Sequence, residues 1–137
     1  MAVDSFLDTN ILVYAYDRDA PAKRKIAVGI VEDGWNQPGS VAISVQVLQE
    51  LYVNLNRRGV PREESAVIVG DLTLWPVVEN TLDLLGSAFG EQVRWKISFW
   101  DALIVAAARA AGASELVTED LNHGQDYGGI RSTNPFR

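Results

Sequence analysis

Short apolar runs alternate along this chain with longer stretches that have helical periodicity. The runs are three to five residues long, which suits strands buried in a sheet better than helices. One run contains Pro76, which has no backbone N–H to donate, so this strand is expected near a sheet edge. The predicted strands are 5–8, 41–43, 74–78 and 115–118, with a further short strand near Ile130.

Helices are predicted between these runs, and several have recognisable ends. Thr9 and Asn10 offer N-cap chemistry to a short helix, whereas Gly34 is expected to end the second helix. The segment 99–111 is rich in alanine and apolar on all sides, which indicates a buried helix. The predicted helices are 11–14, Pro21 to about Asp33, one capped by Ser44 and stopping at Arg57, one from Pro61, one capped by Thr81, and 99–111.

The alternation of strands and helices predicts an α/β fold, with a parallel sheet covered by helices on both faces. The 137 residues contain no repeat, linker or low-complexity tract, so residues 1–137 are expected to form a single domain. In sheets of this kind, ligands bind beyond the carboxyl ends of the strands. The side chains that follow each predicted strand are therefore the first candidates for chemistry.

Composition excludes several classes of chemistry. There is no cysteine and only one histidine, His123, so thiolate metal sites, thiol nucleophiles and multi-histidine metal sites are excluded. No apolar run approaches the roughly 18 residues of a membrane helix, and Asp4 interrupts any secretory signal. A cytoplasmic protein that does not associate with membranes is expected.

The net charge of −6 is unevenly distributed. Residues 1–62 are neutral, and residues 63–137 supply the whole excess of negative charge. A field that attracts nucleic acid over the whole surface is therefore absent, although two local basic patches remain. They are either solvated helix surface or a binding surface for a polyanion. Their residues are Lys23, Arg24, Lys25, Arg57, Arg58 and Arg62.

Several carboxylates fall where the fold predicts a crevice. Asp8 ends the first strand, Asp120 follows the strand that ends at Thr118, and Asp101 opens the apolar helix. Glu50 flanks the apolar stripe of the helix after 41–43. Singly, these residues have ordinary explanations as a helix cap, a turn residue, a partner of the helix dipole and a solvated helix residue.

Together, the same carboxylates predict a cation site. Two unit charges 4 Å apart repel by about 4 kcal/mol at an effective dielectric of 20, so a cluster must share protons or bind cations. Oxygen ligands without histidine or cysteine favour Mg²⁺ or Mn²⁺. Such a site suits the hydrolysis of a phosphodiester by an activated water.

Four segments resemble the signature blocks of PIN-domain ribonucleases, in particular the VapC-type toxins of toxin–antitoxin pairs. They occur in the expected order and span nearly the whole chain. The segments are Phe6-Leu7-Asp8-Thr9-Asn10-Ile11-Leu12-Val13-Tyr14, Ser44-Val45-Gln46-Val47-Leu48-Gln49-Glu50, Phe99-Trp100-Asp101-Ala102-Leu103-Ile104 and Leu116-Val117-Thr118-Glu119-Asp120-Leu121.

The resemblance implies a role for each matching polar residue. Asn10 would orient the first aspartate, and Thr118 would lie beside the water on the metal. Ser44 counts as a supporting residue at the start of the second block. Glu119 is a less favoured alternative to its neighbour as the fourth acidic ligand. The acidic quartet implied by the resemblance is Asp8, Glu50, Asp101 and Asp120.

The resemblance also implies a three-layer α/β/α sandwich with a mostly parallel sheet of four to five strands. It implies an endoribonuclease that depends on Mg²⁺ or Mn²⁺, an antitoxin partner, an RNA substrate and a homodimer. Trp35 and Tyr127 are candidates for stacking on unpaired bases. Two alternatives stay open, a non-catalytic interaction module on a PIN fold and a Mg²⁺-dependent phosphohydrolase of small substrates.

Overall fold

A parallel sheet forms the centre of the molecule in the computed structural model, which describes residues 3–137. Within those residues, five strands lie in the order β3-β2-β1-β4-β5, and every neighbouring pair is parallel. The predicted α/β class and sheet are confirmed. The strands are β1 (Ser5–Leu7), β2 (Val41–Ser44), β3 (Val77–Val78), β4 (Glu115–Val117) and β5 (Arg131–Thr133).

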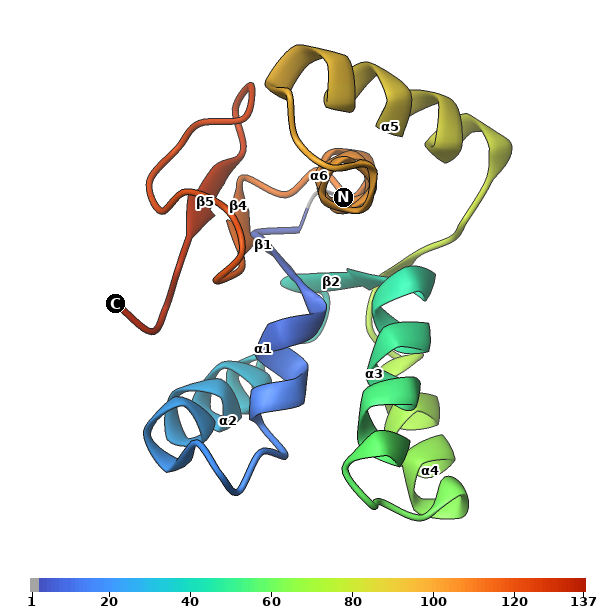
Figure 1. The fold of residues 1–137 in the computed structure, drawn as a ribbon, viewed down its shortest axis with the longest axis vertical. Helices are drawn as coiled ribbons and strands as arrows, with labels where there is room; N and C mark the ends of the chain where they lie inside the picture. Colours follow the sequence, from blue (N-terminus) through green and yellow to red (C-terminus); the bar gives the residue numbers. More distant parts are fainter. Residues whose placement is uncertain (1–2) are drawn as a thin grey trace.

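Helices cover the sheet on both sides (Figure 1). The pairs α1–α2 and α3–α4 extend as two arms to one side, and α6 lies on the other side with α5 outside it. The sheet is therefore the middle layer of three. The helices are α1 (Thr9–Tyr14), α2 (Pro21–Asn36), α3 (Val45–Arg57), α4 (Arg62–Leu72), α5 (Leu82–Trp95) and α6 (Phe99–Ala110).

Side-chain caps fix the starts of four helices within residues 3–137, namely α1, α3, α5 and α6. Ser44 and Thr81 cap α3 and α5 as predicted, because each side-chain oxygen accepts the backbone N–H of the third residue onward. For α1, the cap predicted at Thr9 or Asn10 was wrong, and the ordinary explanation of Asp8 as a helix cap is confirmed. Asp8 is the cap, and its carboxylate accepts the backbone N–H of Thr9. Capping thereby fixes the first candidate carboxylate at the junction of β1 and α1.

The sequence predicts that the second helix ends at Gly34, and this prediction was wrong. The helix α2 continues to Asn36. A Cβ on Gly34 would lie 2.7 Å from the ring of Trp75, which follows α4 and is buried. The glycine therefore serves the close approach of a tryptophan to the helix backbone rather than helix termination.

The helix α6 lies between the sheet and α5 (Figure 1). Its residues 102–108 are all buried, which confirms the burial predicted from its apolar sequence. It packs against β2 and β4 on one side and α5 on the other. No helix within residues 3–137 is both long enough and apolar enough to cross a membrane.

Candidate active site

Asp8 lies at the carboxyl end of the central strand, with only 6% of its surface exposed. Its Oδ1 accepts the backbone N–H of Thr9 at 2.7 Å. Its Oδ2 accepts the hydroxyl of Thr118 at 2.8 Å and the amide of Asn10 at 3.4 Å. The strands β1 and β4 are neighbours, and for this reason the residues following both of them meet at one edge of the sheet.

Asn10 connects two carboxylates at this edge. Its Nδ2 donates to Asp120 Oδ2 at 3.0 Å and also lies within bonding distance of Asp8 Oδ2. The backbone N–H of Asp120 donates to the hydroxyl of Thr118 at 3.1 Å. The structure thus places Asn10 and Thr118 in contact with Asp8 and Asp120.

Glu50 reaches the same edge from α3, the helix that follows β2. Its Oε1 accepts the hydroxyl of Thr9 at 2.9 Å and the amide of Gln46 at 3.2 Å. Glu50 and Asp120 both line a pocket of about 270 Å³ beside α1. Ser44 acts as the cap of α3 and is buried, with its side chain bonded to the backbone of Val47.

Burial dominates the electrostatics of Asp8. It raises the pKa of this carboxyl from 3.8 to about 7, because the charged form loses its hydration. The hydrogen bonds from Thr118 and Thr9 oppose the rise, and the nearby charges of Asp120 and Glu50 add to it. Near neutral pH, the protein on its own therefore favours proton sharing at Asp8, and a cation placed beside it would favour the charged form.

Asp101 stands at the start of α6, where its backbone N–H donates to Ser98 Oγ at 3.1 Å. The other end of α6 lies at the amino edge of the sheet, because Val3 N–H donates to Ala111 O. A helix of 12 residues is about 18 Å long, so the start of α6 lies toward the carboxyl edge.

The candidate carboxylates are nevertheless not drawn into one closed cage. Within residues 3–137, no hydrogen bond or ion pair joins Asp101 to Asp8, Glu50 or Asp120. In the same range, no three carboxylate or imidazole groups stand in an arrangement that could hold a metal ion as it is. The structure connects Asp8, Asp120 and Glu50 through Asn10 and Thr9, and leaves Asp101 outside this network.

Glu119, the alternative acidic ligand, is already occupied by other partners. Tyr14 donates to its Oε1 at 2.6 Å, and Lys23 pairs with its Oε2 at 2.9 Å. Although burial acts to raise the pKa of Glu119, these two partners outweigh it and lower the pKa. Both oxygens are therefore engaged away from Asp8, which favours Asp120 as the residue of this pair that serves the acidic site.

The basic patches border a second cavity between the two helical arms. This cavity, of about 570 Å³, lies between the segment after α1 and the segment joining α3 to α4. Arg24 and Arg58 line it, and Arg58 also lines the smaller pocket beside Glu50. Arg58 is paired with the buried Asp17 at 3.1 Å, so part of its charge is neutralised.

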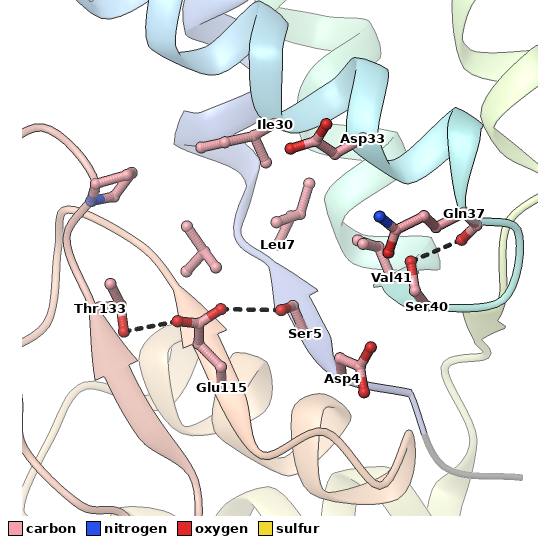
Figure 2. A pocket seen from close by; sticks show the side chains of 12 residues that line it. Asp4, Ser5, Leu7, Ile30, Asp33, Gln37, Ser40, Val41, Glu115 and Thr133 are labelled. Atoms are coloured by element: carbon pink, nitrogen blue, oxygen red, sulfur yellow. Dashed lines mark hydrogen bonds between the residues drawn. The ribbon is translucent and has the colours of Figure 1, made fainter.

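A different hollow, of about 340 Å³, lies between α2 and the strands of the sheet (Figure 2). Figure 2 shows Glu115 between Ser5 and Thr133, whose hydroxyls donate to its two oxygens at 2.9 and 3.1 Å. These bonds tie three neighbouring strands together. None of the carboxylates of the predicted quartet lines this hollow.

The structure contradicts one predicted base-stacking residue. Tyr127 is 1% exposed and packs edge-on against Trp95 at 5.3 Å, so no base can reach its ring. Trp35 is 40% exposed, although one side of it packs against Trp75.

Thr9 and Gln46, which contact Glu50, lie inside the segments that the sequence singled out but were not recognised as site residues. Their spacing, directly after Asp8 and four residues before Glu50, was the available signal.

The fold and the acidic edge together define a known class of protein. A sequence profile of the PIN domain matches residues 5–125. The chain therefore belongs to the PIN domain family.

Particular relatives are similar over most of the chain. Ribonuclease VapC24 of Mycobacterium tuberculosis is 28% identical over 141 residues, which cover 95% of both chains. A second relative is VapC20 from Mycobacterium tuberculosis, a sarcin–ricin loop cleaving toxin of known structure. Its sequence is 28% identical to this chain, and the two structures have a TM-score of 0.63. The match covers 82% of this chain and 87% of VapC20. A toxin–antitoxin complex from Klebsiella pneumoniae has a chain 20% identical with a TM-score of 0.71, covering 96% of this chain and 98% of that one, and shares the fold.

Proposed function

We propose that this chain is a VapC-type endoribonuclease, the toxin of a toxin–antitoxin pair. The observation that carries the proposal is the group of Asp8, Asp120 and Glu50 at the carboxyl edge of a PIN-domain sheet. The two similar VapC proteins are a ribonuclease and an RNA-loop-cleaving toxin by name. The alternative of a non-catalytic module is less well supported, because a buried charged carboxylate is costly and a neutral side chain could cap α1 in place of Asp8.

The donor set fits a divalent cation. All the candidate ligands are carboxylate oxygens, which suit Mg²⁺ or Mn²⁺. Burial opposes a lone negative charge on Asp8, and a bound cation compensates it. Asp8, Asp120, Glu50 and Asp101 would hold the cation, directly or through water. A cation held there supplies a Lewis acid for the phosphate and lowers the pKa of the attacking water.

The remaining residues of the site act on geometry and charge. Asn10 keeps Asp8 and Asp120 side by side through its amide. Thr118 donates to Asp8 and accepts from the backbone of Asp120, which fixes the loop after β4. The RNA backbone is proposed to run between the two arms, where Arg58 borders both cavities. The other residues of the proposed RNA track are Lys23, Arg24, Lys25, Arg57 and Arg62.

We expect the Asp101→Asn variant to lose at least about 100-fold in RNA cleavage, more than outer-shell substitutions usually cost. Asp83→Asn is the matched control, because Asp83 occupies the first turn of α5 as Asp101 occupies the first turn of α6. The measurement is cleavage of a panel of structured RNAs with Mn²⁺ or with EDTA. Equal cleavage by all three proteins would remove Asp101 from the site. If the wild-type protein cleaves none of the RNAs with Mn²⁺, the proposed ribonuclease activity is contradicted.

The proposed homodimer has a candidate surface on α5. Leu82 and Val93 are 86% and 80% exposed, and Phe89 on the same helix is 52% exposed. Trp100 of α6 is 64% exposed and, like Phe89, packs against Phe99. Exposed apolar patches of this kind are typical of interaction surfaces. We expect Leu82→Glu combined with Val93→Glu to convert a dimer into a monomer, measured by light scattering after gel filtration.

The control for this variant is Val67→Glu, an exposed apolar residue on α4, which should remain dimeric. A dimer that survives both substitutions on α5 would place the contact elsewhere. A wild type that is monomeric at tens of micromolar would contradict the dimer itself. An antitoxin partner follows from the same proposal, with its peptide covering the groove between the arms.

A further inference from the structure

The two oxygens of Glu50 have different surroundings. Oε1 accepts two hydrogen bonds, from the hydroxyl of Thr9 at 2.9 Å and from the amide of Gln46 at 3.2 Å. Within residues 3–137, no protein donor reaches Oε2. One oxygen is therefore held by the protein, and the other is open to a ligand.

Thr9 links this glutamate to the central strand. Its backbone N–H donates to Asp8 Oδ1 at 2.7 Å, and its side-chain hydroxyl donates to Glu50. The residue is buried and is the first residue of α1. The hydrogen bond to Glu50 sets the direction of its hydroxyl. Asp8 lies at the junction of β1 and α1, and Glu50 lies on α3. Thr9 bonds to both carboxylates and thereby fixes their relative positions.

Gln46 donates to the same oxygen of Glu50 from within α3. It precedes Glu50 by one turn of α3, and its side chain is buried. Its own Oε1 has no hydrogen-bond partner. A buried acceptor without a partner destabilises a protein, so this oxygen contributes nothing to stability, and the only side-chain hydrogen bond given for Gln46 within residues 3–137 is the one to Glu50. Turning the amide over would place this oxygen against the carboxylate, which fixes the observed orientation.

We infer that Thr9 and Gln46 are positioning residues that aim the open Oε2 of Glu50 at the cation site. The inference rests on the proposed function, because it gives these residues a role only if a cation binds between the carboxylates. Groups that hold metal ligands from behind commonly change metal affinity 10- to 100-fold when they are removed.

The test is the dissociation constant for Mn²⁺, measured from the electron paramagnetic resonance signal of the free ion. Thr9→Val keeps the shape and the backbone N–H of Thr9, and is expected to weaken Mn²⁺ binding about 10-fold or more. Thr9→Ser keeps the hydroxyl and should bind Mn²⁺ as tightly as the wild type. Thr133→Val is the matched control, because its hydroxyl also bonds to a carboxylate, Glu115, but at the hollow of Figure 2.

A double-mutant cycle separates positioning from a general structural effect. If Thr9 acts through Glu50, then Thr9→Val should change the Mn²⁺ affinity less than about twofold in a Glu50→Gln background. Gln46→Leu should weaken Mn²⁺ binding without lowering the melting temperature of the metal-free protein.

Two results would overturn the inference alone: unchanged Mn²⁺ affinity in Thr9→Val, or an equal loss with and without Glu50. A wild type that binds no Mn²⁺ would overturn the proposed function together with it.

Discussion

Asp8→Asn should abolish RNA cleavage and yet make the metal-free protein more stable at pH 8 than the wild type. The reason for the lost activity is the removal of the central carboxylate of the site. The reason for the gain in stability is the burial of Asp8, which raises the pKa of its carboxyl from 3.8 to about 7. An asparagine carries no charge at any pH and avoids this cost.

The sign of the pH dependence follows from the two states of the protein. Below about pH 4, Asp8 is protonated in the folded and the unfolded chain, and contributes nothing. Between about pH 4 and pH 7 the unfolded chain releases this proton and the folded one keeps it, so the free energy of unfolding falls by about 1.4 kcal/mol per pH unit. Above pH 7 the loss is constant.

Urea unfolding in EDTA at pH 5 and pH 8 measures this effect. The stability of Asp8→Asn relative to the wild type should increase by about 2–3 kcal/mol between the two pH values. Glu119→Gln is the comparison, because the pKa of Glu119 is lowered and its substitution should bring no such gain. If the free energies of unfolding of the wild type and of Asp8→Asn change equally from pH 5 to pH 8, then Asp8 is not the source of the pH dependence.

Arg109→Met should lower the free energy of unfolding by about 2 kcal/mol, because it removes the charged hydrogen-bond donor of the buried Glu91, although Arg109 itself is 38% exposed. The guanidinium of Arg109 bonds both oxygens of Glu91, at 3.0 and 3.1 Å. It also donates to the backbone carbonyls of Tyr127 and Gly128, at 2.7 and 2.9 Å. Glu91 is only 7% exposed, so without the arginine its charge would remain buried and poorly compensated.

Chemical unfolding of Arg109→Met and of two further variants of this chain tests this prediction. Arg94→Met is the control, because Arg94 lies over the ring of Trp95 at 4.4 Å but forms no ion pair within the described part of the chain. It should cost less than about 1 kcal/mol. Removing both charges, with Glu91→Leu in the Arg109→Met background, should recover part of the loss. A stability of Arg109→Met within about 0.5 kcal/mol of the wild type would contradict the role given to the pair.

Local sequence signals predicted the elements of the fold well where the determinant is local. The caps Ser44 and Thr81 were found because capping involves a side chain and a backbone N–H three residues apart. The end of α2 was misplaced because the partner of Gly34 is Trp75, which lies 41 residues away in the sequence. Tyr127 was misread for the same reason, since its burial depends on Trp95 and α5.

The candidate site shows the same division. The topology of a parallel sheet predicts that residues after β1 and β4 meet, and Asp8 and Asp120 do share Asn10. The bond from Gln46 to Glu50 joins residues one turn apart in α3 and therefore had a local signal, whereas the bond from Thr9 to Glu50 depends on how α3 packs against α1. The position of Asp101 relative to the other carboxylates depends likewise on the packing of α6.

The sheet ends at β3 in a strand of only two residues, directly preceded by Pro76. An incoming strand has almost no row of free backbone groups to copy there, and proline interrupts the row that exists. This edge is therefore poorly suited to templated growth into fibrils or to runaway pairing between chains. Contacts between copies of this chain are therefore expected to use its helix surfaces, such as the exposed apolar residues of α5, rather than this edge.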